Sequence, residues 1–119
     1  MLNILILSDE SKQILPLFKA SGFTADTQNP NRASEVSGAP VHREGYDIAF
    51  LDLDVENWQQ RLLEVRHRLP VIVFSHPDLK KTVEAVKLGA TDYLEKPLTT
   101  ETVDLSCIQI YAQHPDFIR

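Results

Sequence analysis

Short apolar runs alternate along the chain with longer amphipathic segments. Apolar runs bounded by turn residues predict buried strands. We place these strands at residues 3–7, 23–27, 46–53, 71–75 and 92–95. The segment from Tyr46 to Leu53 is the clearest of them, and the segment from Asp92 to Glu95 is the shortest.

Four further segments carry apolar residues at helical spacing, and short polar residues suited to capping precede them. We expect helices from Ser8-Asp9-Glu10-Ser11 to about Ala20, from a cap at Asp54 to about Leu69, from His76-Pro77-Asp78 to Gly89, and near 100–113. The last segment is ambiguous. Its residues Val103, Leu105 and Cys107 alternate as in a strand, while Val103, Cys107 and Ile110 also fit one helix face.

Three details of these elements are specific enough to test. Pro16 is awkward inside the first helix, where it predicts a kink or two short pieces. In the helix that ends at Gly89, we expect Leu79, Val83 and Val86 to point inward. Residues 29–45 are the least regular part of the chain and offer one weak helical turn at 31–36.

Strands that alternate with helices of this length predict a parallel sheet with right-handed crossovers. No repeat, linker or low-complexity stretch divides the chain, so we expect residues 1–119 to form a single domain. The fold class is therefore α/β, with helices on both faces of the sheet.

Composition limits the classes of function. The net charge of −5, without a basic stripe bearing aromatic residues, argues against direct nucleic-acid binding. No apolar run is long enough to span a bilayer and the first residues lack a basic signal region, so we expect a cytoplasmic protein and no membrane partner. The single cysteine, Cys107, excludes an intrachain disulfide and lies in an apolar context typical of inert packing.

Polar residues stand at the ends of the predicted strands. Asp52, Ser75 and Lys96 close three of the apolar runs, and Asp9 follows the first run. In an open parallel sheet, ligands bind outside the carboxyl ends of the strands. We therefore expect a carboxylate, a hydroxyl and an ammonium group to converge there, a set suited to a divalent cation and a phosphoryl group.

These residues resemble a known family, the receiver domains of two-component response regulators. The matching stretches are Ile4-Leu5-Ile6-Leu7-Ser8-Asp9-Glu10, Tyr46-Asp47-Ile48-Ala49-Phe50-Leu51-Asp52-Leu53, Leu69-Pro70-Val71-Ile72-Val73-Phe74-Ser75 and Ala85-Val86-Lys87-Leu88-Gly89-Ala90-Thr91-Asp92-Tyr93-Leu94-Glu95-Lys96-Pro97. The resemblance covers about residues 3–112, and the last stretch is the most specific. It implies a flavodoxin-like fold with five parallel strands in the order 2-1-3-4-5. It also implies a signalling domain that is not an enzyme. Because the resemblance covers nearly the whole chain, we expect no output domain within residues 1–119, which would be either a stand-alone receiver or part of a longer regulator.

The resemblance assigns roles by position. Asp52 would be the phosphoacceptor, Asp9 a Mg²⁺ ligand together with Asp52, and Lys96 the ammonium group that contacts the acyl phosphate. Ser75 would hydrogen-bond a phosphoryl oxygen, and Tyr93 would be an aromatic switch that turns inward when Ser75 moves. Pro97 would follow a cis peptide bond.

The chain departs from the family pattern near Asp52. Ser8 stands where the family usually has an acidic residue, so we expect weakened Mg²⁺ binding. Asp54 stands where the family supplies a backbone carbonyl to the metal. We interpret Asp54 as a helix cap and keep a metal ligand as the alternative. His76 is bulkier than the family's small residue, so it would narrow access to Asp52, shield an acyl phosphate or make the site pH-sensitive.

The expected function is that of a receiver domain. A histidine kinase or a histidine phosphotransfer protein would donate a phosphoryl group to Asp52. The face built from the helix after Asp78, the strand 92–95 and the element 100–113 would then change its affinity for an output domain, a partner protein or a second copy. The alternative is a pseudo-receiver that docks or dimerises without phosphorylation, which Ser8 and His76 favour. An unrelated enzyme or nucleotide binder ranks last, because no glycine-rich phosphate loop follows the first strand.

Overall fold

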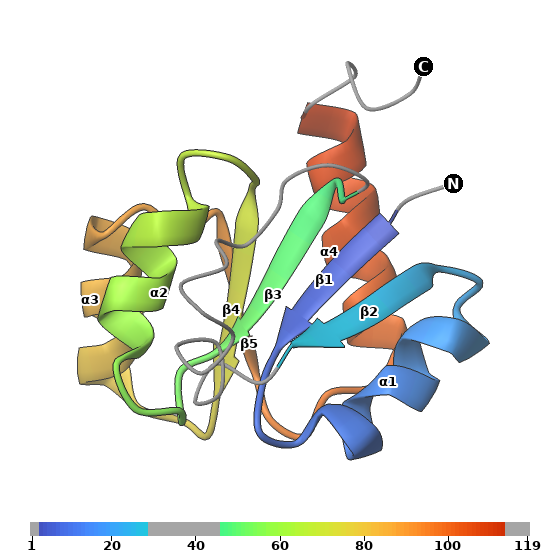
Figure 1. The fold of residues 1–119 in the computed structure, drawn as a ribbon, viewed down its shortest axis with the longest axis horizontal. Coiled ribbons are helices and arrows are strands. Elements are labelled where there is room, and N and C mark those ends of the chain that lie inside the picture. Colours follow the sequence, from blue (N-terminus) through green and yellow to red (C-terminus); the bar gives the residue numbers. More distant parts are fainter. Residues whose placement is uncertain (1–2, 29–45, 114–119) are drawn as a thin grey trace.

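A computed structural model of the chain describes residues 3–28 and 46–113. Its five strands form one parallel sheet in the order β2-β1-β3-β4-β5 (Figure 1). The strands are β1 (Asn3–Leu7), β2 (Thr24–Gln28), β3 (Ile48–Asp52), β4 (Val71–Ser75) and β5 (Asp92–Glu95). The predicted strand order is therefore confirmed, and the predicted turn at 31–36 lies outside the described residues.

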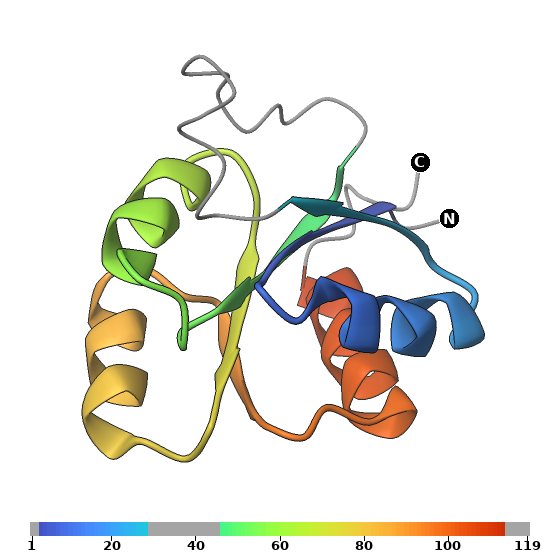
Figure 2. The same ribbon diagram turned by 60° about the horizontal axis from the view of Figure 1, so that its bottom comes forward.

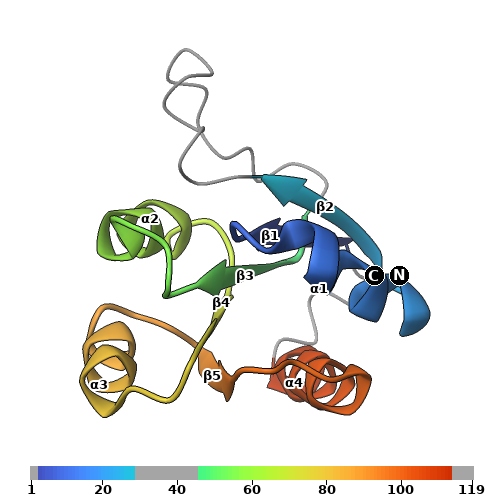
Figure 3. The ribbon, with the colours of Figure 1, turned by 90° about the horizontal axis from the view of Figure 1, so that it is seen from below.

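Helices cover both faces of this sheet. They are α1 (Ser11–Ala20), α2 (Trp58–Val65), α3 (Leu79–Lys87) and α4 (Thr100–Gln113). Helices α1 and α4 lie on one face, and α2 and α3 lie on the other (Figures 2 and 3). The ambiguous segment 100–113 is thus a helix, which buries Val103, Cys107 and Ile110 along one side.

The core consists of two apolar layers, because side chains of a strand alternate between the faces of the sheet. On the face of α1 and α4, Phe18 meets Phe50 edge to face, with ring centroids 4.7 Å apart. On the other face, Trp58, Leu62 and Val65 of α2 pack on residues such as Leu51 and Val73. Because helices cover both sides of the central strands, residues 48–51 and 71–74 form continuous apolar runs in the sequence.

Two expectations about helices need correction. Asp54 does not cap a helix: α2 begins at Trp58, after Asn57 in the left-handed region with φ 59°. The Asp54 carboxylate accepts hydrogen bonds from His76 and from Lys81 of α3 instead, so it is not available to the backbone of α2. Pro16 does not divide α1, which runs as one helix from Ser11 to Ala20.

The third correction concerns the orientation of α3. Leu79, Val83 and Val86 were expected to point inward, but they are 79%, 44% and 57% exposed. The inward side of the helix instead holds Ala85, which is fully buried. Asp78 caps this helix by accepting from the backbone N–H of Lys81, and Lys81 reaches back to Asp54. Leu88, three residues after Ala85, packs partly buried against the same core cluster, so this side of the helix faces the sheet.

Cys107 is buried, as its apolar context predicted, and burial raises the pKa of its thiol to about 12. A thiol of such low acidity is protonated at neutral pH, which agrees with inert packing. No helix in the described part of the chain is both long and apolar enough to cross a membrane.

Two glycines with positive φ, Gly22 (86°) and Gly89 (105°), end helices α1 and α3. A Cβ at Gly22 would meet nothing within 4 Å, whereas at Gly89 it would lie 2.9 Å from Cδ of Arg66. We expect Gly22→Ala to lower the free energy of unfolding by about 1 kcal/mol, the cost of left-handed backbone. Gly89→Ala should cost somewhat more, because the Arg66 side chain must move away and give up its hydrogen bond to the Leu88 carbonyl (2.8 Å).

Urea unfolding of the single variants and of Arg66→Ala/Gly89→Ala checks this comparison. In the Arg66→Ala background, the cost of Gly89→Ala should fall toward that of Gly22→Ala. An unchanged cost in that background would show that backbone conformation alone sets the effect.

Candidate functional site

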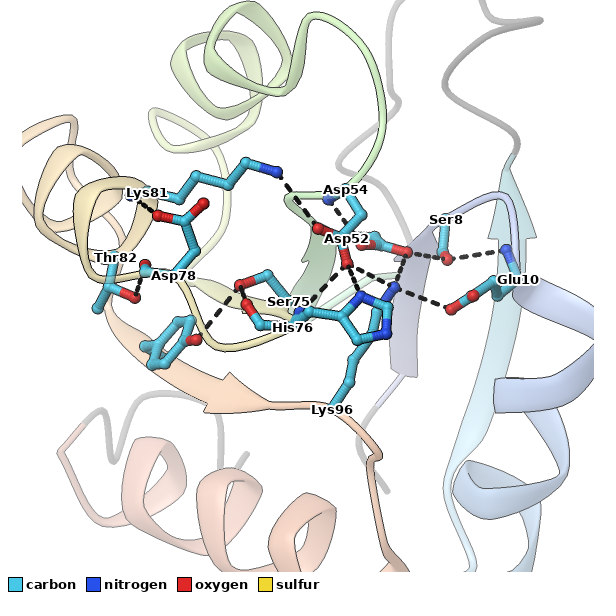
Figure 4. Close-up of polar contacts among 11 residues, drawn as sticks. Ser8, Glu10, Asp52, Asp54, Ser75, His76, Asp78, Lys81, Thr82 and Lys96 are labelled. Atoms are coloured by element: carbon cyan, nitrogen blue, oxygen red, sulfur yellow. Dashed lines mark hydrogen bonds and ion pairs between the residues drawn. The ribbon is translucent and has the colours of Figure 1, made fainter.

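Polar side chains gather at the carboxyl ends of the central strands (Figure 4). Asp52 is the last residue of β3 and Ser75 is the last residue of β4. Ser8 follows β1 directly, and Lys96 follows β5. Parallel pairing places Leu7 beside Leu51 and Asp52 beside Phe74, so these ends meet at one edge of the sheet.

Asp52 is held in a closed set of hydrogen bonds. Its side chain is buried, and Oδ2 accepts from Ser8 Oγ (2.7 Å) and Lys96 Nζ (2.9 Å). The other oxygen, Oδ1, accepts from the backbone N–H of Asp54 at 2.9 Å. Both carboxylate oxygens therefore have donors, which satisfies a buried charge that would otherwise be costly.

Lys96 is the shared cation of the site. Its side chain is only 8% exposed, and Nζ lies 2.9 Å from Asp52, 2.8 Å from Glu10 Oε2 and 3.0 Å from Asp54 Oδ2. Burial by itself lowers the pKa of Lys96, but its hydrogen bonds to the three carboxylates outweigh burial and hold the pKa above its ordinary value. The ammonium group is therefore charged at neutral pH. The Lys96–Pro97 peptide bond is cis, as the resemblance implied.

Asp54 is the most heavily bonded carboxylate of the site. Besides Lys96, its Oδ2 accepts from the backbone N–H (3.2 Å) and Nδ1 (2.9 Å) of His76, and its Oδ1 accepts from Lys81 Nζ (3.3 Å). Burial works against its charged form, yet the hydrogen bonds from Lys96, His76 and Lys81 lower its pKa well below the ordinary value. Because a carboxylate only accepts, Nδ1 is the nitrogen of His76 that carries the proton.

Ser75 faces away from Asp52. Its Oγ donates to the His76 carbonyl at 2.7 Å and lies 3.2 Å from the hydroxyl of Tyr93. The two residues predicted to act as a switch are thus in direct contact. The ring of His76 bonds the carboxylate of Asp54, and its side chain remains 71% exposed.

The predicted metal ligands are only partly assembled. Asp9 lies exposed in the turn after β1, next in sequence to the Ser8 that bonds Asp52. The carboxylate of Asp9 and the hydroxyl of Ser8 supply oxygen atoms, the type of ligand that Mg²⁺ takes. Asp54 is engaged by Lys96, Lys81 and His76. Within residues 3–28 and 46–113, no group of three His, Cys, Asp or Glu side chains is arranged to hold a metal ion. The described residues therefore form no assembled metal site, and Mg²⁺ binding by Asp9 and Asp52 stays a prediction.

Two residues of the site were missed by sequence reasoning. Glu10 contacts Lys96, and Lys81 contacts Asp54. Both lie in first turns of segments that start at the carboxyl edge of the sheet, Glu10 just before α1 and Lys81 in α3. Each residue lies a few positions after the end of a strand, Glu10 after β1 and Lys81 after β4, and this position could have pointed to the site.

Sequence comparisons find relatives of the chain among curated proteins, although no family model matches it. The alginate biosynthesis transcriptional regulatory protein AlgB of Pseudomonas putida is 32% identical, over 87% of this chain and 25% of that protein. AlgB of Pseudomonas aeruginosa is also 32% identical, over 87% of this chain and 24% of that protein. The chain thus spans about a quarter of the length of these relatives.

Solved structures share the fold. A response regulator receiver domain protein from Clostridium thermocellum superposes with a TM-score of 0.79 at 22% identity, with both chains fully covered. A response regulator from Thermotoga maritima superposes with a TM-score of 0.74 at 21% identity, over 94% of this chain and 98% of that one.

The strand order defines the fold class: the domain has the flavodoxin-like fold, which it shares with solved response regulator receiver domains. Together with the similarity to the AlgB regulators, this fold supports a receiver domain of the kind found in two-component response regulators.

Proposed function

We propose that the domain accepts a phosphoryl group on Asp52 from a histidine kinase or a histidine phosphotransfer protein, and that this changes its affinity for a partner. One observation carries the proposal: Lys96 Nζ lies 2.9 Å from Asp52 Oδ2 at the carboxyl edge of the sheet. A carboxylate is a weak nucleophile, and a fixed ammonium group beside it neutralises the charge that develops on a transferring phosphoryl group.

The reaction that we propose forms a bond between an oxygen of Asp52 and the phosphorus. The bond between the phosphorus and the donor's histidine nitrogen breaks, and its electron pair returns to that nitrogen. Oδ2 must exchange its hydrogen bond from Ser8 for the new bond, while Lys96 stays in contact with the phosphoryl oxygens. Bound Mg²⁺ would supply further charge neutralisation, with Asp9 and Asp52 as its ligands.

Ser75 and Tyr93 would report the modification. The Ser75 hydroxyl is bonded to the His76 carbonyl and lies 3.2 Å from the hydroxyl of Tyr93, so donating to a phosphoryl group requires it to rotate. Rotation breaks the contact with Tyr93, which frees that ring to repack. The phosphoryl charge is thereby converted into a change at the end of β5.

The face formed by α3, β5 and α4 is the proposed surface for an output domain, a partner protein or a second copy. It carries exposed apolar side chains on both helices, Leu79 and Val86 on α3 and Leu105 and Ile108 on α4. Exposed large apolar side chains on the two helices that flank the edge strand β5 make these helices candidates for contact with a partner. The domain would thus act in signalling by binding rather than as an enzyme.

The alternative function is a pseudo-receiver that binds its partner without phosphorylation. The observation that favours it is the closed state of Asp52, which is 1% exposed and has donors on both oxygens. A phosphoryl donor reaches this carboxylate only after the surrounding side chains move.

Beryllofluoride with millimolar Mg²⁺ tests the two functions directly. If Asp52 accepts phosphoryl groups, this phosphoryl mimic should shift the amide NMR signals of Asp52, Ser75 and Tyr93, and acetyl phosphate should add one phosphoryl group by mass spectrometry. Asp52→Asn should abolish both responses. Asp47→Asn is the matched control, because Asp47 precedes β3 at its opposite end and bonds Asn3 instead of Lys96. Wild-type protein that shows neither response would leave the pseudo-receiver as the function.

A further inference from the structure

The carboxylate of Asp54 occupies a group of hydrogen-bond donors that converge from three elements. The donors are the backbone N–H and Nδ1 of His76 after β4, Nζ of Lys81 in α3 and Nζ of Lys96 after β5. We call these four groups the donor cluster. Two of them are cationic and one is a backbone N–H, a combination that binds anionic oxygens well.

The donor cluster lies where an anion attached to Asp52 would sit. Lys96 Nζ contacts Asp52 Oδ2 at 2.9 Å and Asp54 Oδ2 at 3.0 Å, so one ammonium group joins both carboxylates. The backbone N–H of Asp54 also donates to Asp52 Oδ1. A phosphoryl group on Asp52 would carry its oxygens toward Lys96, into space that the Asp54 carboxylate fills.

We propose that Asp54 is an internal competitor for the phosphoryl position, a positioning residue whose carboxylate must leave the donor cluster before an external anion can enter. This proposal deepens the proposed function and rests on it for its consequence, that Asp54 slows phosphorylation of Asp52. Asp54 suits this role because its side chain is 26% exposed and belongs to the turn before α2, from which it can swing outward.

The geometry separates this role from two others. A helix cap would bond the first turn of α2, whereas Asp54 bonds residues of the β4–α3 loop, α3 and the segment after β5. A metal ligand would direct its oxygens to a site shared with other carboxylates, whereas Asp54 directs both oxygens to donors. Because its carboxylate occupies the donor cluster, Asp54 competes with any other anion for these donors.

The first experiment uses free sulfate as the probe and needs neither metal nor phosphorylation. Sulfate is titrated into the wild type, Asp54→Ala, Asp54→Asn and Glu56→Gln while the His76 amide signal is followed by NMR. Glu56 is an exposed carboxylate in the same turn, so its variant matches the change in net charge. We expect half-saturation of Asp54→Ala at about tenfold lower sulfate than wild type, the scale of one or two charge-assisted hydrogen bonds. Glu56→Gln should match wild type.

The second experiment measures the rate of Asp52 labelling by acetyl phosphate in the same variants. Faster labelling of Asp54→Ala and Asp54→Asn than of Glu56→Gln supports the competitor role, and slower labelling overturns it. A His76 signal that responds to sulfate equally in all variants, or in none, also overturns it. If no variant is labelled at all, the proposed function fails, and the sulfate titration alone decides whether Asp54 competes with anions.

Discussion

Replacing Lys96 with methionine is expected to lower the free energy of unfolding at neutral pH by about 3 kcal/mol, the scale for removing one partner of a buried ion pair. Methionine keeps most of the apolar stem but not the charge. Asp52, buried at the end of β3, would then face Glu10 and Asp54 without the cation that the three carboxylates share. Labelling of Asp52 by acetyl phosphate should be lost as well.

The matched control is Lys81→Met. Lys81 also bonds Asp54, at 3.3 Å, but its side chain is 34% exposed, and pairs of this kind contribute about 0–1 kcal/mol. Lys96→Met/Asp52→Asn should recover much of the stability, because it removes the buried charge that Lys96 neutralised. Urea unfolding of the four proteins checks both statements, and equal losses for the two lysine variants would contradict the importance of the buried pair.

The stability lost in Lys96→Met should depend on pH in a defined direction. Hydrogen bonds from Lys96 help to lower the pKa of Asp54 in the folded protein. The stability that comes from this lowering is present above the unfolded value of about 4 and is lost as the pH falls through the folded value. The difference between wild type and Lys96→Met should therefore be largest near neutral pH and shrink in acid.

The second large effect is expected at Ser8. Its hydroxyl is fully buried and donates to Asp52 Oδ2 at 2.7 Å, so Ser8→Asp would bring two carboxylates into contact. Like charges at this distance disfavour the folded state, and we expect a loss of about 2–3 kcal/mol without Mg²⁺. Because the variant also regains the second acidic residue typical of the family, added Mg²⁺ should restore stability by mass action.

Thermal unfolding of wild type, Ser8→Asp and Ser8→Ala with and without millimolar Mg²⁺ tests this expectation. Ser8→Ala removes the hydrogen bond to Asp52 and the one accepted from the Glu10 backbone N–H without adding charge, so it should cost about 1–2 kcal/mol and show no gain with Mg²⁺. A Ser8→Asp protein that Mg²⁺ does not stabilise would show that the missing carboxylate is not what weakens the metal site.

The sequence predicted the sheet well, for a physical reason. Strands covered by helices on both faces must be apolar throughout, so residues 48–51 and 71–74 can be recognised as strands from the sequence alone. The position of polar residues immediately after such runs also brought Asp52 and Lys96 to one edge. The 100–113 segment stayed ambiguous because apolar residues spaced for a strand (period 2) and for a helix (period 3.6) coincide over short spans. In the structure it is a helix that packs against α1.

What the sequence did not predict depends on contacts between distant segments. The spacing of Leu79, Val83 and Val86 fits an inward face, but Ala85 and Leu88 are the residues of this segment that pack on the core. Asp54 matched a helix cap by its position, yet its carboxylate accepts hydrogen bonds from three other segments. No local pattern distinguishes these two roles of Asp54, since its nearest donor in sequence, His76, is 22 positions away.

The strand order has a consequence for self-association of the domain. It places β2 and β5 at the two edges of the sheet, and these strands read Thr-Ala-Asp-Thr-Gln and Asp-Tyr-Leu-Glu. Short edge strands with charged residues resist pairing with the edge of another sheet, which is the common route to strand-mediated aggregation. Pairing of two copies through β2 or β5 is thus disfavoured by the charged residues on these edge strands.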